Sequence, residues 1–136
     1  MQVSFTIPGR IRGKGRPRFS RAAGVIHTYT DEKTASSEAM VKTIAALAMR
    51  GRSILQGPLG LKILVFQRPA ESWSKKRKAA AKWIVGKPDC DNQIKLLCDS
   101  MNGIVWADDA QVAQISFERR YSMIDPEYVA VTAYEL

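Results

Sequence analysis

Leu59-Gly-Leu-Lys-Ile-Leu-Val-Phe66 is the stretch of sequence that decides the fold. A short apolar run of this kind predicts a central strand, and it is much too brief to cross a bilayer. Toward the N-terminus, residues 2–7 alternate polar and apolar side chains, which predicts a half-buried strand that ends at Pro8-Gly9. Residues 25–30 predict a short strand or an extended segment.

A helix is expected between these segments and the central strand. Thr30 or Asp31 can cap it, and Gly51 ends it. We expect this helix to direct four apolar side chains inward, namely Met40, Ile44, Leu47 and Ala48.

Two further helices are expected after the central strand. Ser72 is a candidate N-cap for a short basic helix, which residues 86–88 (Gly-Lys-Pro) end. The next helix begins at Asp89 or Asp91 and ends at Asn102-Gly103, two residues that readily adopt the left-handed conformation.

Two strands close the chain, over residues 111–121 and 128–134, with a turn at Asp125-Pro126 between them. The sequence contains no internal repeat and no linker that would divide it. It therefore predicts an α+β fold in which residues 1–136 form a single compact domain, with a mixed β-sheet and helices packed against it.

The charge of the chain is unevenly distributed. The 136 residues include 21 Lys and Arg and 13 Asp and Glu, which leaves a net charge of +8. Residues 1–88 hold 18 basic and 4 acidic side chains (+14), whereas residues 89–136 hold 3 basic and 9 acidic ones (−6). Because 46% of the residues are hydrophobic, the chain is not a disordered basic tail. The basic part indicates an anionic partner, and the acidic end needs a separate explanation.

Composition also limits the compartment and the kind of metal site. Residues 1–5 lack the charged start and apolar run of a signal peptide, so we expect a soluble, cytoplasmic protein. Cys90 and Cys98 would lie about 12 Å apart on one helix, too far for a disulfide. With these two cysteines and a single His27, one chain cannot build a four-ligand zinc site. Any metal must be bound by oxygen.

A basic loop covers residues 9–21. It holds six basic residues and no acid, and its glycines and Pro17 predict that it is not a regular element. The basic residues are Arg10, Arg12, Lys14, Arg16, Arg18 and Arg21.

An acidic metal-site segment covers residues 87–112. Asp89 and Asp91 stand two residues apart in the extended segment before a helix, so they project to the same side. A divalent cation such as Mg²⁺ needs oxygen ligands, and Asp108 and Asp109 can supply a third carboxylate. Adjacent residues in an extended chain face opposite ways, so we expect one of that pair to bind metal and the other to support it.

The same residues are also compatible with simpler roles. Lys95 lies one helical turn after Asp91, where it can stabilise developing charge or form an ordinary surface ion pair. Asp89 and Asp91 can simply cap a helix. Asp-x-Asp pairs also occur in nucleotidyltransferases and glycosyltransferases, whereas Gln93 and the lack of a following glycine argue against a calcium loop.

Taken together, the motifs resemble the signature of the RusA family of Holliday-junction resolvases. The residues that carry the resemblance are Lys87-Pro-Asp-Cys-Asp-Asn-Gln-Ile-Lys95, Asp99, Asn102-Gly103, Trp106 and Asp108-Asp109-Ala-Gln-Val112. It continues upstream in Pro8-Gly9, Lys14-Gly-Arg-Pro-Arg18-Phe19 and Ser72-Trp-Ser-Lys-Lys-Arg77, and so covers most of the chain in order.

This resemblance implies a homodimeric, Mg²⁺-dependent endonuclease, with Mn²⁺ as a possible substitute, that resolves four-way DNA junctions by paired symmetric nicks in recombination and repair. It implies catalytic roles for Asp89, Asp91, Asp109 and Lys95, and a supporting metal-site role for Asp108. The expected setting is the cytoplasm of a bacterium, with the gene belonging to the bacterium or to its phage. A twofold dimer suits the substrate because resolving a near-symmetric junction takes two nicks.

The basic residues then become candidates for binding DNA phosphates without reading bases. In the loop these are Arg10, Arg12, Lys14, Arg16 and Arg18, and in the expected short helix Lys75, Lys76, Arg77 and Lys78. A merely solvated helix face or a nuclear-localisation signal would also account for the second group.

Three other functions compete with this prediction. A non-catalytic protein that binds branched DNA would keep the fold and the basic surface. A nuclease could prefer three-way or flap DNA. A nucleotidyltransferase is disfavoured because no Gly-Ser pair precedes the Asp-x-Asp pair.

Overall fold

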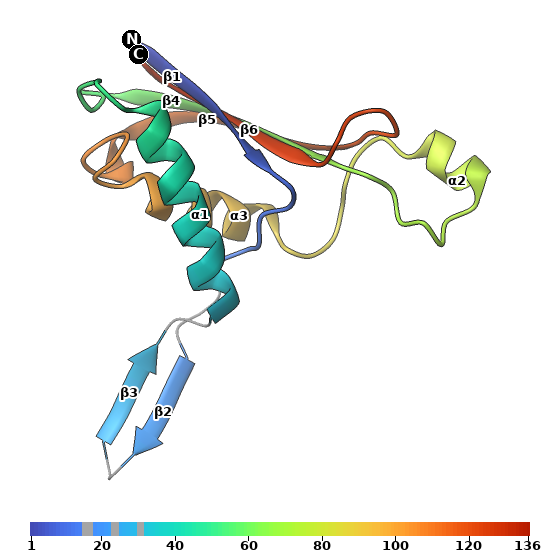
Figure 1. Cartoon of the computed structure of the whole chain (residues 1–136), viewed down its shortest axis with the longest axis horizontal. Coiled ribbons are helices and arrows are strands. Elements are labelled where there is room, and N and C mark those ends of the chain that lie inside the picture. Colours follow the sequence, from blue (N-terminus) through green and yellow to red (C-terminus); the bar gives the residue numbers. More distant parts are fainter. Residues whose placement is uncertain (15–17, 23–24, 30–31) are drawn as a thin grey trace.

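The main sheet has four strands in the order β1-β6-β4-β5 in the computed structural model (Figure 1). The structure describes residues 1–14, 18–22, 25–29 and 32–136. The strands are β1 (Gln2–Pro8), β4 (Leu59–Gln67), β5 (Val112–Tyr121) and β6 (Tyr128–Glu135).

The sheet is mixed, as predicted, and β4 lies inside it. β4 pairs antiparallel with β6 and parallel with β5, so Ile63 has Val131 on one side and Phe117 on the other. The last two strands of the chain are therefore not neighbours, because β4 lies between them. The strand predicted over residues 2–7 is confirmed as β1, which pairs antiparallel with β6 at the edge of the sheet.

Two helices cover one face of this sheet. They are α1 (Glu32–Ala48) and α3 (Cys90–Met101), which lie below the strands in Figure 1. The core between these layers includes Ile63 of β4, Leu97 of α3 and Trp106, all with no exposed surface. Both cysteines are free. The α+β fold is thus confirmed.

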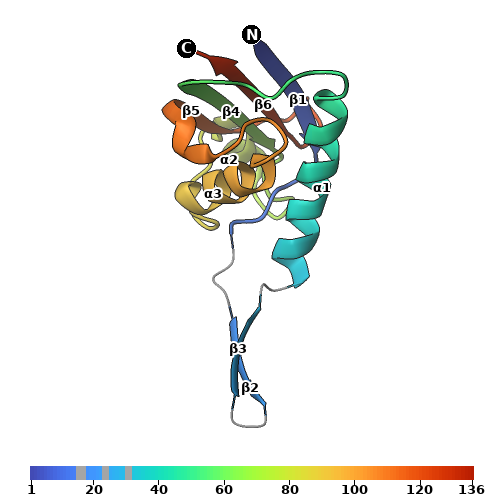
Figure 2. The same cartoon turned by 90° about the vertical axis from the view of Figure 1, so that its left-hand side faces the viewer.

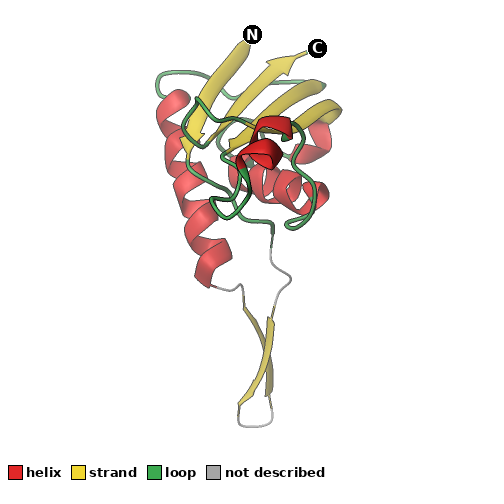
Figure 3. Ribbon diagram, turned by 90° about the vertical axis from the view of Figure 1, so that its right-hand side faces the viewer, coloured by secondary structure: helices red, strands yellow, loops and turns green. Residues whose placement is uncertain are grey.

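Smaller elements lie outside these two layers. The short helix α2 (Lys75–Ala80) and its flanking loops are at the end of the molecule nearest the viewer in Figure 3. The 3-10 helix η1 (Asp109–Gln111) leads into β5. β2 (Arg18–Ala22) and β3 (Val25–Tyr29) form a separate antiparallel pair, apart from the main sheet (Figure 2).

Several local predictions were wrong. The end of the expected basic loop is not irregular, because Arg18–Ala22 forms a strand whose partner is β3. Leu47 is 65% exposed rather than inward, since Val41 and Ala45 carry the buried stripe of α1.

The start of α2 also differs from the prediction. Ser74, not Ser72, caps this helix, and its hydroxyl accepts a hydrogen bond from Arg77 N at 3.1 Å. The caps proposed for α1, Thr30 and Asp31, lie outside the described residues. No helix in the described part of the chain is long and apolar enough to cross a membrane.

A close approach on the open face of the sheet requires Gly60. The ring of Tyr134 packs on Gly60, its register partner in β6, so closely that an added Cβ would lie 2.3 Å from two ring carbons. The Tyr134 hydroxyl donates to Gln114 Oε1 at 3.1 Å, which ties the ring to β5. Gly60 therefore lets one aromatic side chain bridge three adjacent strands.

Gly60→Ala should destabilise the protein by about 1–3 kcal/mol, since overpacking forces the Tyr134 ring out of its position. Urea unfolding of Gly60→Ala, of Tyr134→Ala and of the double variant measures the coupling free energy between the two positions. The cost of Gly60→Ala should be smaller when Tyr134 is already truncated, and an equal cost in both backgrounds would contradict this packing.

Candidate active site

The first acidic pair lies at the start of α3. Asp89 is its N-cap residue, but the carboxylate makes no capping hydrogen bond. It accepts instead from Lys87 Nζ at 2.9 Å, in an exposed ion pair of the kind that contributes at most about 1 kcal/mol. Asp91 lies in the first turn and is exposed. Both carboxylates are therefore accessible to a cation.

Lys95 follows Asp91 by one turn of α3 and is exposed. Within the described part of the chain it forms no ion pair, so the surface pair with Asp91 that the spacing allowed is not made. Its ammonium group remains available to an anion that approaches the start of α3.

The second acidic pair has two different local roles. Asp108 caps η1: its Oδ1 accepts from Ala110 N at 3.0 Å, while Gln111 Oε1 accepts from Asp108 N at 3.1 Å. This reciprocal capping fixes the Asp108 side chain. The arrangement favours Asp109 as the member of the pair that is available to a metal.

Carboxylates crowd around Asp109. Burial raises the pKa of Asp109, and so do the hydrogen bond and charge of Asp108 and the charge of Asp99. A hydrogen bond from Asn102 acts in the opposite direction. Asn102 is oriented by Trp106, whose buried indole N–H donates to its Oδ1 at 2.7 Å. A nearby cation would relieve this repulsion.

Lys14 connects the basic loop to these acids. Its ammonium group pairs with Glu38 of α1 and lies 3.4 Å from Asp99 Oδ2. Burial lowers the pKa of Lys14, but the hydrogen bond and charge of Glu38, together with Asp99, outweigh this and raise it. Lys14 was predicted to bind DNA, and in the structure it is already held by two carboxylates.

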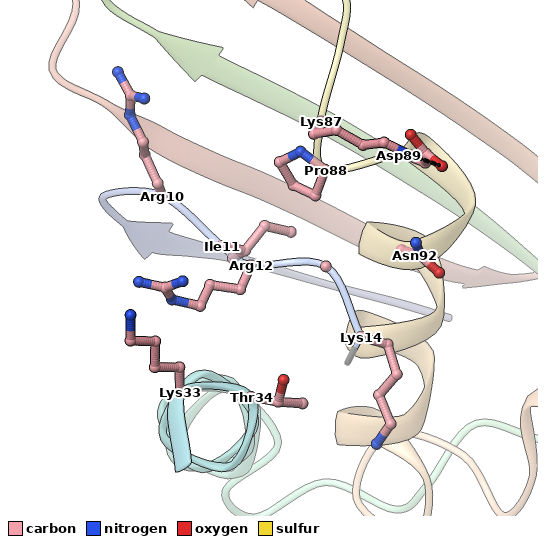
Figure 4. A pocket seen from close by; sticks show the side chains of 11 residues that line it. Arg10, Ile11, Arg12, Lys14, Lys33, Thr34, Lys87, Pro88, Asp89 and Asn92 are labelled. Atoms are coloured by element: carbon pink, nitrogen blue, oxygen red, sulfur yellow. Dashed lines mark hydrogen bonds and ion pairs between the residues drawn. The ribbon is translucent and has the colours of Figure 1, made fainter. Parts of the chain in front are cut away.

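A basic cavity of about 670 Å³ opens beside Asp89 (Figure 4). Asp89 is the acidic residue in its lining, and the basic residues there come from three segments of the chain. These basic residues are Arg10, Arg12, Lys14, Lys33 and Lys87. The cavity can therefore bind an anion such as a phosphate next to Asp89.

The predicted DNA-binding residues are only partly brought together. Arg10 and Arg12 line the basic cavity, although Arg10 also donates to Glu127 at 2.7 Å. Arg16 lies outside the described residues, and Arg18 is described only as part of β2. The basic run of α2 (Lys75, Lys76, Arg77 and Lys78) does not line this cavity.

Sequence reasoning missed Lys33, whose contribution depends on how α1 packs. The side chain reaches the cavity beside Arg12 (Figure 4) because the first turn of α1 faces the basic loop. In sequence it is an ordinary helix lysine. No local pattern marks it.

Arg119 and Gln93 hold the start of α3 in place. The Arg119 guanidinium donates from β5 to Pro88 O at 2.7 Å and to Gln93 Oε1 at 3.4 Å. Gln93 is fully buried, and its Nε2 donates to Ile11 O at 3.3 Å. This Arg119–Gln93 clamp thus joins the sheet, the loop before Asp89 and the basic loop, and sequence reasoning missed it.

Gly13 allows the basic loop to approach α3. An added Cβ would lie 2.9 Å from the Pro88 Cβ and 3.0 Å from the Asn92 Cβ. Lys14 N donates to Asn92 O at 2.9 Å in the same contact. The part of the basic loop around Gly13 and Lys14 is therefore held against the start of α3.

The two acidic pairs offer the kind of ligand that a divalent metal ion binds. All the candidate ligands are carboxylate oxygens, which Mg²⁺ prefers. No three Asp, Glu, His or Cys side chains among the described residues lie close enough to hold a metal by themselves. Mg²⁺ does not require such a cage, because it is commonly bound by one or two carboxylates together with water and substrate phosphates.

Known proteins match this chain over most of its length. The family model described as "Endodeoxyribonuclease RusA" matches residues 8–132, a range that includes both acidic pairs and Lys95. YqaN of Bacillus subtilis (strain 168), described as an uncharacterized protein, is 30% identical over 126 residues, which is 88% of each chain. The resemblance inferred from the motifs is therefore confirmed.

Arg119→Lys should loosen the loop before Asp89, because lysine cannot donate to Pro88 and Gln93 at once in the same geometry. Unpaired buried acceptors cost about 1–3 kcal/mol, and amide hydrogen exchange should become faster around residues 86–93. Arg120→Lys is the matched control, since the neighbouring arginine pairs with Glu118 at the surface. Equal exchange rates in the two variants would contradict the clamp.

Proposed function

Since the chain belongs to the RusA family of endodeoxyribonucleases, we propose that it resolves four-way DNA junctions by Mg²⁺-dependent hydrolysis, with Mn²⁺ as a substitute. The observation that carries this proposal is the position of Asp89 in the lining of a basic cavity. A phosphate bound by the cations of this cavity would lie next to the carboxylate of Asp89, two residues before Asp91.

Charge distribution supports the proposal. The cavity attracts the DNA backbone through Arg12, Lys33 and Lys87, whereas the carboxylates repel it. A divalent cation removes the repulsion, so productive binding and cleavage should depend on the same ion. Phosphate contacts of this kind read no bases, so substrate choice rests on DNA shape.

Asp89, Asp91 and Asp109 would hold the ion, with Asp108 supporting Asp109. When bound, Mg²⁺ lowers the pKa of water and neutralises phosphate charge. Lys95 places a positive charge one turn from Asp91, where it stabilises charge that develops on the scissile phosphate. The Arg119–Gln93 clamp keeps the first acidic pair aligned with the cavity.

A homodimer would provide the two active sites that paired nicks need. Each chain offers one set of the proposed catalytic residues, and a four-way junction has approximate twofold symmetry. Such an enzyme would act in recombination and repair on DNA in the cytoplasm of a bacterium, whether the gene is bacterial or carried by a phage.

The second candidate is a protein that binds branched DNA without cutting it. The separation of the acidic groups favours this alternative, because no metal-binding trio forms among the described residues. Three-way and flap substrates are also compatible with the basic cavity. Cleavage assays on each substrate, with and without Mg²⁺, distinguish these possibilities.

Asp91→Asn should reduce Mg²⁺-dependent cleavage of a four-way junction by about 100-fold or more, the effect of losing one group that stabilises transition-state charge. Metal-free binding of the junction should be kept, because the position is exposed and the change removes a negative charge. Asp125→Asn, in the loop between β5 and β6, is the matched control. Unchanged cleavage by Asp91→Asn would refute the assigned site.

Mixed dimers should test the paired nicks. When wild-type chains are mixed with excess Asp91→Asn chains, most active dimers hold one competent site. We expect singly nicked junctions to accumulate on a plasmid-borne four-way junction, measured on a native gel as nicked rather than linear product. Linear product in unchanged proportion would show that the two cuts do not come from two chains of one dimer.

A further inference from the structure

Residues 82–84 extend the main sheet beyond its β5 edge. Trp83 forms an antiparallel bridge with Arg120, and Ile84 N donates to Arg119 O at 3.0 Å. Tyr121 N donates to Lys82 O at 2.9 Å. These contacts fix the main chain at Trp83, whose side chain is 51% exposed.

A pocket of about 510 Å³ lies between this segment and α2. We call it the aromatic pocket and define it by Trp73, Arg77, Lys82, Trp83 and Tyr121, which line it together with small and apolar residues. No acidic side chain of the described residues lines it. It is separate from the basic cavity, with which it shares no lining residue.

Cations already stack on the rings of this pocket. The Arg77 guanidinium lies 3.8 Å from the centroid of the Trp73 ring. The rings of Trp73 and Tyr121 form a T-shaped pair with their centroids 5.4 Å apart. Arg120 lies 4.7 Å and Lys82 5.3 Å from the Trp83 ring. The pocket thus combines flat π surfaces with positive charge.

This combination matches a nucleotide better than a peptide. A base offers a ring that stacks on indole or guanidinium. Its phosphate is negative and can pair with Arg77 and Lys82, which form no ion pair with the described residues. An acidic or apolar peptide would satisfy only one of these two features. Paired bases inside a duplex cannot reach such a surface, whereas bases at a branch point can unstack.

We propose that the aromatic pocket binds an unpaired nucleobase, with its phosphate, of the branched DNA substrate. The nature of the substrate rests on the proposed function. Trp83 and Asp89 are six positions apart, a span of at most about 20 Å of extended chain, which is about six base-pair steps of a duplex. The pocket would therefore hold a base within about six nucleotides of the phosphate that is cut.

Intrinsic fluorescence tests the pocket without requiring cleavage. Single-stranded oligo(dT) of ten nucleotides should quench the tryptophan emission of the whole protein, because a base stacks on exposed indole. Trp83→Ala should weaken binding by about 10-fold, within the range for loss of one base–aromatic stack. Because this variant lacks the tryptophan itself, the affinity is measured by the fluorescence anisotropy of the same oligonucleotide with a fluorescein label. Trp83→Phe should restore most of the affinity, since a smaller ring still stacks.

Leu47→Ala is the matched control, because it removes another exposed apolar side chain from a distant helix. Thermal unfolding of each variant verifies that it folds. Binding of the labelled oligonucleotide that is weakened in Trp83→Ala and kept in Leu47→Ala supports the pocket even if the protein cuts no junction. If the wild-type protein cuts junctions while Trp83→Ala binds oligo(dT) and junctions as tightly as wild type, the pocket proposal is overturned and the proposed function stands.

Discussion

The hydrogen bonds of Arg119 are the contacts on which the arrangement of the candidate active site depends. Its guanidinium reaches from β5 to Pro88 O and to buried Gln93, which in turn holds the basic loop through Ile11 O. Three segments that are distant in sequence therefore keep one geometry. The first acidic pair follows directly after Pro88, so its direction relative to the cavity depends on this arginine, whose strand pairs with β4 along its length.

The candidate active site has a basic part, which attracts phosphate groups, and an acidic part, which repels them. The cations of the cavity and the carboxylates at the start of α3 are neighbours, with Lys87 and Asp89 in direct contact. Around Asp109 the carboxylates crowd one another, which raises the pKa of that residue. A divalent cation bound there would reduce this repulsion, which agrees with the metal dependence of the proposed reaction.

Much of the fold could be predicted from local patterns. The apolar run at residues 59–66 and the alternation at residues 2–7 correspond to β4 and β1, since burial on a sheet imposes a period that the sequence displays. The same reasoning failed at Leu47, where the buried face of α1 is set by small Ala45 rather than by the larger leucine. It also failed at Arg18–Ala22, where strand pairing with β3 outweighs a composition typical of loops.

By itself, the sequence determined the α+β class, the central strand, the family and the two acidic pairs, because each depends on residues that are close in the chain and follow a characteristic spacing. Only the tertiary structure decided that Lys14 is held by Glu38 and Asp99, that Lys33 faces the cavity, and that Arg119 fixes the loop before Asp89. These contacts join residues from different elements. Their energies depend on distance and burial in the folded protein, so the pattern of residues within a single segment does not predict them.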